Sequence, residues 1–457
     1  MRGARARTDR MRPTLRPAGC ALVVSAVAWA GNPAPARADE YSLHTLLAGQ
    51  TAATTNAFSE SDSDGDVAIN YQVRPGILFS YHSHKALHEL SAELGFDGYD
   101  FNDNITFTYR GGWRMTYSLS PRAELGLGAG GNGGRVDALS TILPANQGTP
   151  GVLPTGATDF YGADAEQTLS YELTPLWSMR ENAFGRYLLT DAAGSDTRSL
   201  DAGMGLGLDR RFRVTSAGLN LQGSFQRLGT RPSGGMYDDH DQIDARATVR
   251  VRRDFSDRWS GAVEGGMVSL IPLEQDDELF YQPIGSLEVA HFPRWGSAQL
   301  LIAHRVAPNL FLAQTEVSDS VTVNAAVPLP WLARSRFDPK LSALGSIGFS
   351  HTRFKDLEDA SDLASFNVLY SDLAVQYTPE ENLIFAVRYQ FVRQSDSDAV
   401  DPMLQALDYQ RHTLMFTFQG RWPGRVAAEM PARDRIRVRD PLSEGDMFGA
   451  GGTGIRR

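Results

Sequence analysis

Charged side chains placed at regular intervals within apolar segments are the residues of this sequence best able to act together. Arg, Asp and Glu occupy the same alternate positions as Ser, Thr, Asn and Gln, and apolar residues fill the positions between them. A period of two is typical of β-strands, because successive side chains point to opposite faces of a sheet. The charged face must meet water, since burying an ionised group without a partner is strongly unfavourable. The residues predicted to line it include Arg74, Arg110, Arg114, Glu124, Arg246, Arg250, Glu288 and Arg388.

Both signs of charge occur on this predicted face, which limits what it could do. Mixed charge indicates a hydrated path without strong ion selectivity, or a wall of ion pairs that narrows the path. Neither arrangement is a catalytic set, and the chain shows no nucleophile elbow and no His-Glu-x-x-His. We therefore expect a protein that is not an enzyme.

Histidine and acidic groups could bind metal, but each has a simpler interpretation. His82, His84 and His88 lie at a predicted turn without a carboxylate at a fixed spacing. Residues 62–66 begin like a calcium loop but lack the Gly and Glu that an EF-hand needs at its sixth and twelfth positions. A turn and a solvated acidic loop explain these residues, and we expect no metal.

Two further groups are similarly ambiguous in composition alone. The glycines from Gly126 to Gly134 alternate with Leu and Ala, which indicates small lumen-facing residues or a bend rather than a phosphate loop. Asp238–Asp241 with His240 has residue types found in outer-membrane hydrolases, but a solvated loop explains it as well. We expect no cofactor.

The stretch Val67–Tyr81 shows the alternation most clearly and predicts the kind of strand involved. Its fifteen residues would extend about 50 Å at about 3.3 Å per residue. Strands of globular sheets usually have about five or six residues, whereas this length suits a tilted strand that crosses a bilayer. A polar strand face within a membrane finds water only inside a closed barrel. The predicted fold is an all-β, transmembrane, antiparallel up-and-down β-barrel.

Connections of two kinds alternate between the predicted strands. Short turns occur near residues 120–122, 174–175, 210–211, 256–258, 293–294, 328–336 and 378–380. Longer polar links occupy 59–66, 97–104, 137–159, 191–197, 229–241, 274–278, 355–365 and 394–408. Bacterial outer-membrane barrels have short periplasmic turns and longer external loops. This rule gives about eighteen strands, from Leu43–Thr55 to Tyr409–Trp422; sixteen is the alternative, because the first strand and those near Gly261–Leu270 and Thr315–Val327 are weak.

Two terminal segments fall outside the predicted barrel, which covers residues 39–423. Residues 1–38 combine a basic start, an apolar stretch at Ala18–Ala30 and a small-x-small site at Ala36–Ala38, which predicts a secretory signal peptide. Its removal takes away the only Cys and moves the formal net charge from −10 to −16, which argues against a nucleic-acid partner. Residues 424–457 are expected to form a flexible periplasmic tail.

Charged and aromatic residues predict the orientation of the barrel. The long links are mostly acidic, whereas the short turns carry Arg and have Trp, Tyr or Phe beside them, as at a membrane interface. The long links would face the exterior among lipopolysaccharide, where divalent cations could bridge carboxylates to phosphates. We predict the outer membrane of a Gram-negative bacterium as the location, with outer-membrane lipid, lipopolysaccharide and the barrel-assembly machinery as partners.

Three stretches near the start of the barrel, Thr55–Phe58, Asp64–Asp66 and Val73–Ile77, resemble the opening of one barrel group. These are Gram-negative outer-membrane barrels associated with exopolysaccharide export, in which a T-D-N-like stretch precedes an acidic loop and a strand with R/K-P-G. The similarity covers about residues 50–95, and the Asp of T-D-N is missing here. The resemblance implies passage of a polymer through a wide polar lumen, with periplasmic polysaccharide-export proteins as partners.

Three functions are compatible with these patterns. A barrel of about eighteen strands should leave a water-filled channel unless it is plugged, which favours a porin-like protein that passes a small polar solute or a polysaccharide. Alternatively, ion pairs or loops close the lumen, and the barrel is a structural or surface-interaction protein with acidic external loops. A hydrolase ranks last. The Pro- and Gly-rich link Pro144–Thr158 could serve as a lid, but exposure at the surface is the favoured interpretation.

Inserted epitope tags test the predicted orientation. A tag at Asp276 or Asp398 should be labelled on intact cells, because both residues lie in long external links, whereas a tag at Asp257 should be labelled only after permeabilisation. Antibody binding before and after permeabilisation provides the measurement. The reverse labelling pattern would show that the orientation is wrong.

Overall fold

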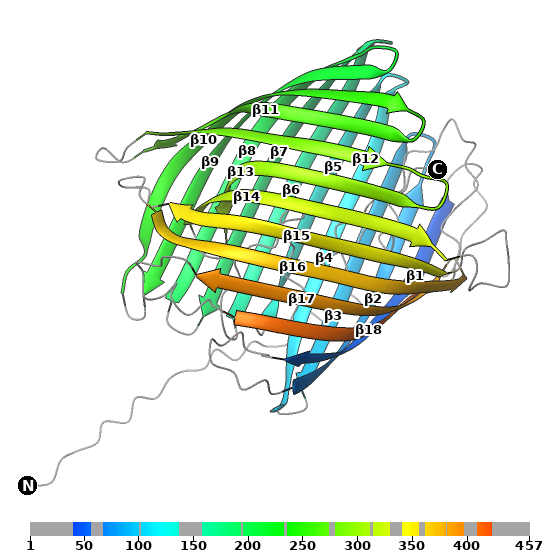
Figure 1. Cartoon of the computed structure of the whole chain (residues 1–457), viewed down its shortest axis with the longest axis vertical. Coiled ribbons are helices and arrows are strands. Elements are labelled where there is room, and N and C mark those ends of the chain that lie inside the picture. Colours follow the sequence, from blue (N-terminus) through cyan, green and yellow to red (C-terminus); the bar gives the residue numbers. More distant parts are fainter. Residues whose placement is uncertain are drawn as a thin grey trace, which may run out of the picture. The chain divides into compact units, whose positions relative to one another are not determined.

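The computed structural model describes residues 40–55, 67–99, 102–136, 158–192, 195–232, 235–273, 279–310, 314–329, 341–355, 362–380, 382–396 and 409–422. These residues belong to one compact unit that begins at Glu40. They form eighteen β-strands in a single antiparallel sheet (Figure 1). The strands are β1 (Glu40–Thr55), β2 (Val67–His82), β3 (Ala86–Tyr99), β4 (Asn102–Ser120), β5 (Ala123–Val136), β6 (Thr158–Thr174), β7 (Trp177–Ala192), β8 (Ser195–Arg211), β9 (Thr215–Pro232), β10 (Asp238–Ser256), β11 (Trp259–Pro272), β12 (Phe280–His291), β13 (Ser297–Asn309), β14 (Gln314–Pro328), β15 (Leu341–Lys355), β16 (Asp362–Glu380), β17 (Leu383–Asp396) and β18 (Tyr409–Trp422).

Pairing of the first strand with the last closes the sheet into a barrel. Each strand pairs with the next in sequence, and β1 also pairs with β18, from Thr45 opposite Trp422 to Thr54 opposite Thr413. Closure removes the two free edges that an open sheet would expose to lipid. The predicted closed antiparallel barrel of about eighteen strands is thus confirmed, including the first strand and the two others that the sequence marked weakly.

The lengths of the connections differ from the prediction at three places. Only residues 100–101 separate β3 from β4, and only 193–194 separate β7 from β8, where longer links were expected. Conversely, residues 329–340 separate β14 from β15, where a short turn was expected. Polar residues such as Asp97 and Asp191 belong to the strands themselves, so polarity alone does not mark the end of a strand.

The outer face of the barrel is apolar, as the alternation predicts. On β2 the residues Val67, Ile69, Tyr71 and Val73 are all exposed, whereas the four residues that follow them in turn are buried on the opposite face. The same parity recurs along the other strands, where exposed Leu, Val, Ile and Phe side chains occupy the outward positions. In water such an apolar surface would be unfavourable by about 25 cal/mol per Å². The outer face is that of a barrel embedded in the outer membrane of a Gram-negative bacterium.

Aromatic side chains surround the short-turn end of this apolar face. The Arg210 guanidinium lies between the rings of Trp177 and Phe212, 5.2 and 4.9 Å from their centroids, and Trp259 stacks on His291 with centroids 4.0 Å apart. Rings with an apolar body and a polar or charged neighbour suit the interface between lipid and water. This arrangement matches the aromatic girdle predicted beside the short turns, and the periplasmic location of that end stays a prediction.

Several sequence predictions fall outside the described residues. These are the signal peptide at 1–38, the acidic stretch 62–66, most of the link Pro144–Thr158 and the tail at 424–457. Within the ranges that the structure describes, no helix is long and apolar enough to cross a membrane.

Adjacent residues of β9 allow the two faces to be compared by mutation. Leu221 faces outward and is exposed, whereas Asn220 faces the lumen. We predict that Leu221→Arg lowers the free energy of unfolding by about 2–4 kcal/mol, since it places a charge in lipid, while Asn220→Arg changes it by less than about 1 kcal/mol. Urea titration of the protein refolded in phospholipid vesicles measures both. Equal losses would contradict the assignment of faces.

Candidate functional site

A hydrogen bond across the barrel identifies its inner face. The Gln242 side-chain amide on β10 donates to the Thr315 hydroxyl on β14, 3.2 Å away. These strands are four positions apart in the sheet, so the bond runs through the interior. The even-numbered residues of β10 therefore face the lumen. Directly paired residues of antiparallel strands share a face, so the register extends this assignment around the barrel.

The register places all eight residues that the sequence singled out on this inner face. For example, Arg246 and Arg250 share the parity of Gln242 on β10, and Arg250 is paired with Glu264 on β11. Because each residue shares a face with its direct partner, the inner face can be followed from strand to strand around the barrel. Each of the eight residues lies on it. The eight are Arg74, Arg110, Arg114, Glu124, Arg246, Arg250, Glu288 and Arg388.

Ion pairs and hydrogen bonds neutralise part of the charge on the inner face. The Arg388 Nε donates to Asp372 at 2.7 Å, and Gln390 donates to the same carboxylate at 3.1 Å. Arg246 Nε lies 2.9 Å from a carboxylate oxygen of Asp244. Such paired charges give the wall a mixed, locally balanced potential.

A looser pair joins β10 to β12. Arg250 lies 3.6 Å from Glu288, and half of its side-chain surface is exposed. Gln299 donates to the same Glu288 carboxylate at 3.1 Å. The solvent-exposed position leaves this arginine able to meet a solute in the lumen.

Strands β4 to β7 form a polar, solvent-exposed part of the inner wall. The exposed residues on this part of the face include Arg110, Arg114, Glu124, Asp164, Glu166 and Arg180. We call it the vestibule wall. It lies toward the short-turn half of the barrel and gives that half of the lumen a wetted, charged lining.

Glycines on β5 leave room on the vestibule wall for the acidic side chains of β6. A Cβ atom added at Gly128 would lie 2.8 Å from Cγ of Glu166, and one at Gly130 would lie 2.8 Å from a carboxylate oxygen of Asp164. Both glycines face the lumen opposite these residues of β6. The carboxylate side chains can therefore lie against the neighbouring backbone instead of standing into the lumen. The glycine run is a strand, as its alternation predicted.

A cluster of apolar side chains lies inside the lumen toward the long-link end. Phe160, Leu188 and Leu228, on the inner faces of β6, β7 and β9, pack with Leu310 from the connection between β13 and β14. The Ser199 hydroxyl on β8 donates to the carbonyl oxygen of Leu310 at 2.8 Å. Leu310 follows β13, five strands away from β8 in the sheet. The end of the β13–β14 hairpin therefore crosses the lumen.

On its β12 side, the hairpin turns from the wall into the lumen. Val306 and Val317, on its lipid-side parity, are fully buried and pack on Val268 and Leu270 from the inner face of β11. Phe280 and Ile284 of β12 pack against the same cluster. We call the described part of this hairpin, residues 305–310 and 314–318, the hairpin plug. Its lipid-side parity packs on β11, and Leu310 at its end packs on β6, β7 and β9.

Strand β15 stays paired with the β14 half of the hairpin plug, from Thr315 opposite Lys355 to Ser318 opposite Thr352. The Lys355 ammonium at the end of β15 lies 6.0 Å from the centroid of the Phe280 ring on β12. These strands are separated in the sheet by β13 and β14. The Lys355 side chain therefore reaches over the end of the hairpin plug to β12, while the plug separates from the wall only on its β12 side.

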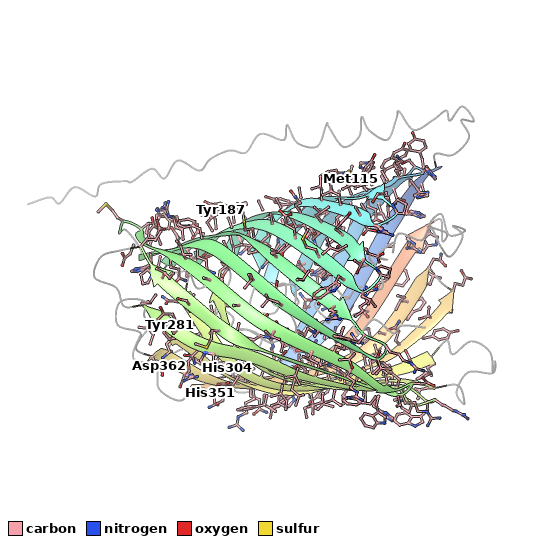
Figure 2. The ribbon with its side chains drawn as sticks, turned by 90° about the horizontal axis from the view of Figure 1, so that it is seen from above. Met115, Tyr187, Tyr281, His304, His351 and Asp362 are labelled. Atoms are coloured by element: carbon pink, nitrogen blue, oxygen red, sulfur yellow. The ribbon has the colours of Figure 1, made fainter. Side chains whose placement is uncertain are left out.

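A group of polar side chains marks the place where the hairpin leaves the wall. His304 Nδ1 lies 2.5 Å from a carboxylate oxygen of Asp319, and the other oxygen of Asp319 lies 3.6 Å from Arg353. His304 Nε2 is 3.3 Å from the Gln282 amide of β12. Figure 2 shows His304 and His351 on the same stretch of wall, opposite the wall that carries Met115 and Tyr187.

Sequence reasoning missed the hairpin plug because its tip is apolar. The predicted external links were all polar, and none was placed near Asn309–Gln314, where the sequence reads Asn-Leu-Phe-Leu-Ala-Gln. An apolar connection between two alternating strands was the available signal. Such a connection is unfavourable in water and indicates burial.

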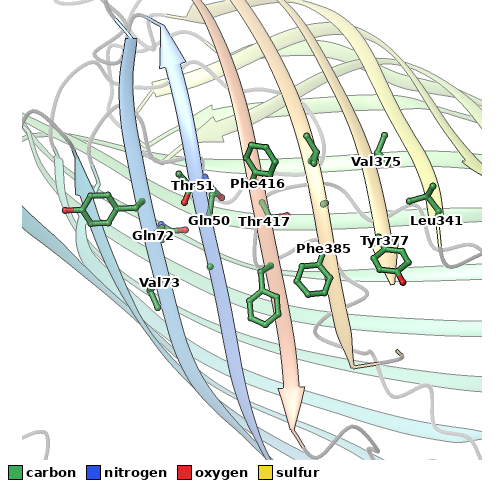
Figure 3. Close-up of a pocket in the computed structure, with 15 residues that line it drawn as sticks. Gln50, Thr51, Gln72, Val73, Leu341, Val375, Tyr377, Phe385, Phe416 and Thr417 are labelled. Atoms are coloured by element: carbon green, nitrogen blue, oxygen red, sulfur yellow. The ribbon is translucent and has the colours of Figure 1, made fainter. Parts of the chain in front are cut away.

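An apolar groove lies elsewhere, on the outer face near the closure of the barrel. Exposed Tyr377, Phe385 and Phe416 line it together with Val73 and Val375 (Figure 3). Their outward parity assigns the groove to the lipid-facing surface rather than to the lumen. Among the described residues, no group of three or more His, Cys, Asp or Glu side chains could hold a metal ion.

Comparisons with known proteins establish the fold. No protein-family model matches the chain, and no curated protein matches its sequence. The FrpB iron transporter of Neisseria meningitidis (F5-1 variant) superposes with a TM-score of 0.51 at 11% identity, over 83% of this chain and 69% of that one. Its apoprotein form gives 0.50 at 10% identity, over 83% and 68%. The siderophore receptor PirA from Pseudomonas aeruginosa gives 0.44 at 8% identity, over 85% and 81%.

A double-mutant cycle tests the ion pair of β16 and β17. We predict a coupling energy of about 1–3 kcal/mol between Arg388→Ala and Asp372→Ala, because the pair is largely buried and bidentate. Arg250→Ala with Glu288→Ala is the matched comparison and should couple by less than about 1 kcal/mol, since it is more exposed and longer. Urea unfolding in vesicles gives both values; equal coupling would contradict the structure.

Proposed function

We propose that the protein is an outer-membrane channel that passes small polar solutes through its lumen. The observation that carries this proposal is a polar, charged inner face that continues around a closed barrel and is solvent-exposed along β4 to β7. Barrels of about 16–18 strands leave an aqueous channel unless they are plugged. Since positive and negative groups are mixed on the wall, the channel should discriminate weakly between small cations and anions.

A barrel without transport is the second candidate, and the hairpin plug favours it. If the plug never leaves the lumen, the protein is a structural or surface-interaction barrel. Outward-facing ion pairs at the long-link end support a contact with lipopolysaccharide in either case. They join Arg198 of β8 to Asp239 of β10, and Arg227 of β9 to Asp241 of β10.

Polysaccharide passage is a narrower version of the channel proposal. It rests on the resemblance of residues 50–95 to exopolysaccharide-export barrels, and it would involve periplasmic polysaccharide-export proteins as partners. An extended polymer would need the whole lumen cleared from end to end. Dextran block of single-channel current separates this version from passage of small solutes alone.

Single-channel recording in planar bilayers tests the proposed function. We predict discrete opening events with a cation-to-anion permeability ratio within about threefold of one. Arg246→Gln with Arg250→Gln should raise this ratio several-fold, because both arginines face the lumen. Arg253→Gln is the matched control. Arg253 is on the same strand, three residues after Arg250, but faces outward, so its substitution should leave the permeability ratio unchanged.

Two results would contradict the channel. If none of these proteins shows opening events, the barrel does not conduct and the structural candidate gains support. If Arg253→Gln alters the ratio as much as the two lumen substitutions, the current does not run along the inner face.

A further inference from the structure

We propose that the hairpin plug is a gate that opens by moving back into the barrel wall, where it would extend the ladder between β12 and β13. This inference rests on the proposed channel and adds how its external mouth is opened and closed.

The seam between β12 and β13 is shorter than the neighbouring seam. Only seven residue pairs join the two described strands, from Gly285 opposite His304 to His291 opposite Ala298, against thirteen between β13 and β14. Residues 280–284 of β12 pair with β11, and in the described structure β13 does not pair with them. Continuing the same register would place Pro283 opposite Val306 and Tyr281 opposite Pro308.

The two prolines explain why this ladder stops. Proline has no N–H to donate, so within a ladder it is tolerated only where its nitrogen points away from the paired neighbour. Pro283 is paired with Met267 of β11, and Pro308 with Thr315 of β14. The nitrogen of each proline must therefore point to the side where the β12–β13 seam would form. Both prolines remove a donor from that seam.

Removal of two donors makes the two positions of the hairpin comparable in free energy. In the wall, the hairpin would gain ladder hydrogen bonds but lack those two. Inside the lumen, it gains the apolar contacts of Val306, Val317 and Leu310 and the hydrogen bonds to Ser199 and Gln242. The edge of β13 that lacks a partner in β12 can therefore switch between these two positions.

The polar side chains around His304, at the base of the hairpin plug, suit a hinge. The contact between His304 and Asp319 joins β13 to β14, and Thr322 of β14 bonds Tyr370 of β16 at 2.9 Å below it. The pairing between β13 and β14 continues up to Asn309 opposite Gln314. Residues 315–318 of β14 also pair with the end of β15. The two half-strands and the end of β15 therefore move together, and the movement withdraws Leu310 from Phe160, Leu188 and Leu228.

Crosslinking the tip to the far wall tests the gate. The double variant Ser199→Cys/Leu310→Cys, treated with a short cleavable bis-thiol reagent, should lose at least tenfold in open probability, and cleavage of the linker should restore it. The natural Cys20 lies in the predicted signal peptide and is left out of the refolded protein. As a control, Ser297→Cys/Ala326→Cys links directly paired residues of β13 and β14 far from the plug and should not change gating.

Removing the prolines tests the gate from the other direction. Pro283→Val with Pro308→Val returns two donors to the seam and should raise the open probability several-fold. Loss of opening, or no change, would overturn the proposal. An unchanged current in the crosslinked Ser199/Leu310 protein would also overturn it, while leaving the channel itself intact.

A distance measurement separates failure of the gate from failure of the channel. Spin labels at the same two cysteines, measured by pulsed electron resonance in lipid, should give a short and a long distance whose proportions shift toward the long one in the proline variant. Two distances without any current would support the moving hairpin and overturn the channel. A single short distance in both proteins would overturn the gate.

Discussion

Hydrogen bonding of the backbone within lipid is the constraint on which the rest of this structure depends. No water is available there to satisfy an N–H or a carbonyl group, so every strand must be paired on both sides and the sheet must close. Closure is achieved by pairing β1 with β18. Once the sheet is closed, alternation of side chains assigns one face to lipid and the other to the lumen, which is why polar and apolar residues alternate so regularly.

The β12–β13 seam shows how the same constraint is met by other means. Part of this seam is not paired, and there the hairpin plug packs on side chains of β11 and β12, while Lys355 lies 6.0 Å from the centroid of the Phe280 ring. Apolar packing replaces ladder hydrogen bonds over a short stretch. The barrel thereby combines a wetted vestibule at one end with a packed closure at the other, and both are built from described strands rather than from an added domain.

The regular part of this architecture follows from local sequence, whereas the plug does not. Period-two alternation around Arg74, Arg246 and Arg388 suffices to place these residues on one face, because the parity of a strand is a local property. The ion pairs that they make depend on the register between strands and could not be read from spacing. The predicted lengths of the connections were wrong where polar residues such as Asp191 belong to the end of a strand.

The plug escaped prediction for a related reason. Its sequence is an apolar connection between two alternating strands, and its burial depends on contacts with β6 to β11, which are far away in the chain. Pro283 and Pro308 were visible as residues but gained meaning only when the register showed them on either side of one seam. Tertiary contact, not propensity, determines the position of this hairpin.

The central claim is that one face of each strand lines an aqueous lumen, and a cysteine scan of β9 tests it most directly. Single cysteines at residues 216 to 225, in the protein without Cys20, would be exposed in lipid vesicles to a membrane-impermeant thiol reagent. The account predicts labelling at 216, 218, 220 and 222 and protection at 217, 219, 221 and 223, since the even-numbered residues of β9 face the lumen. Uniform labelling, or labelling of the odd-numbered positions, would contradict it.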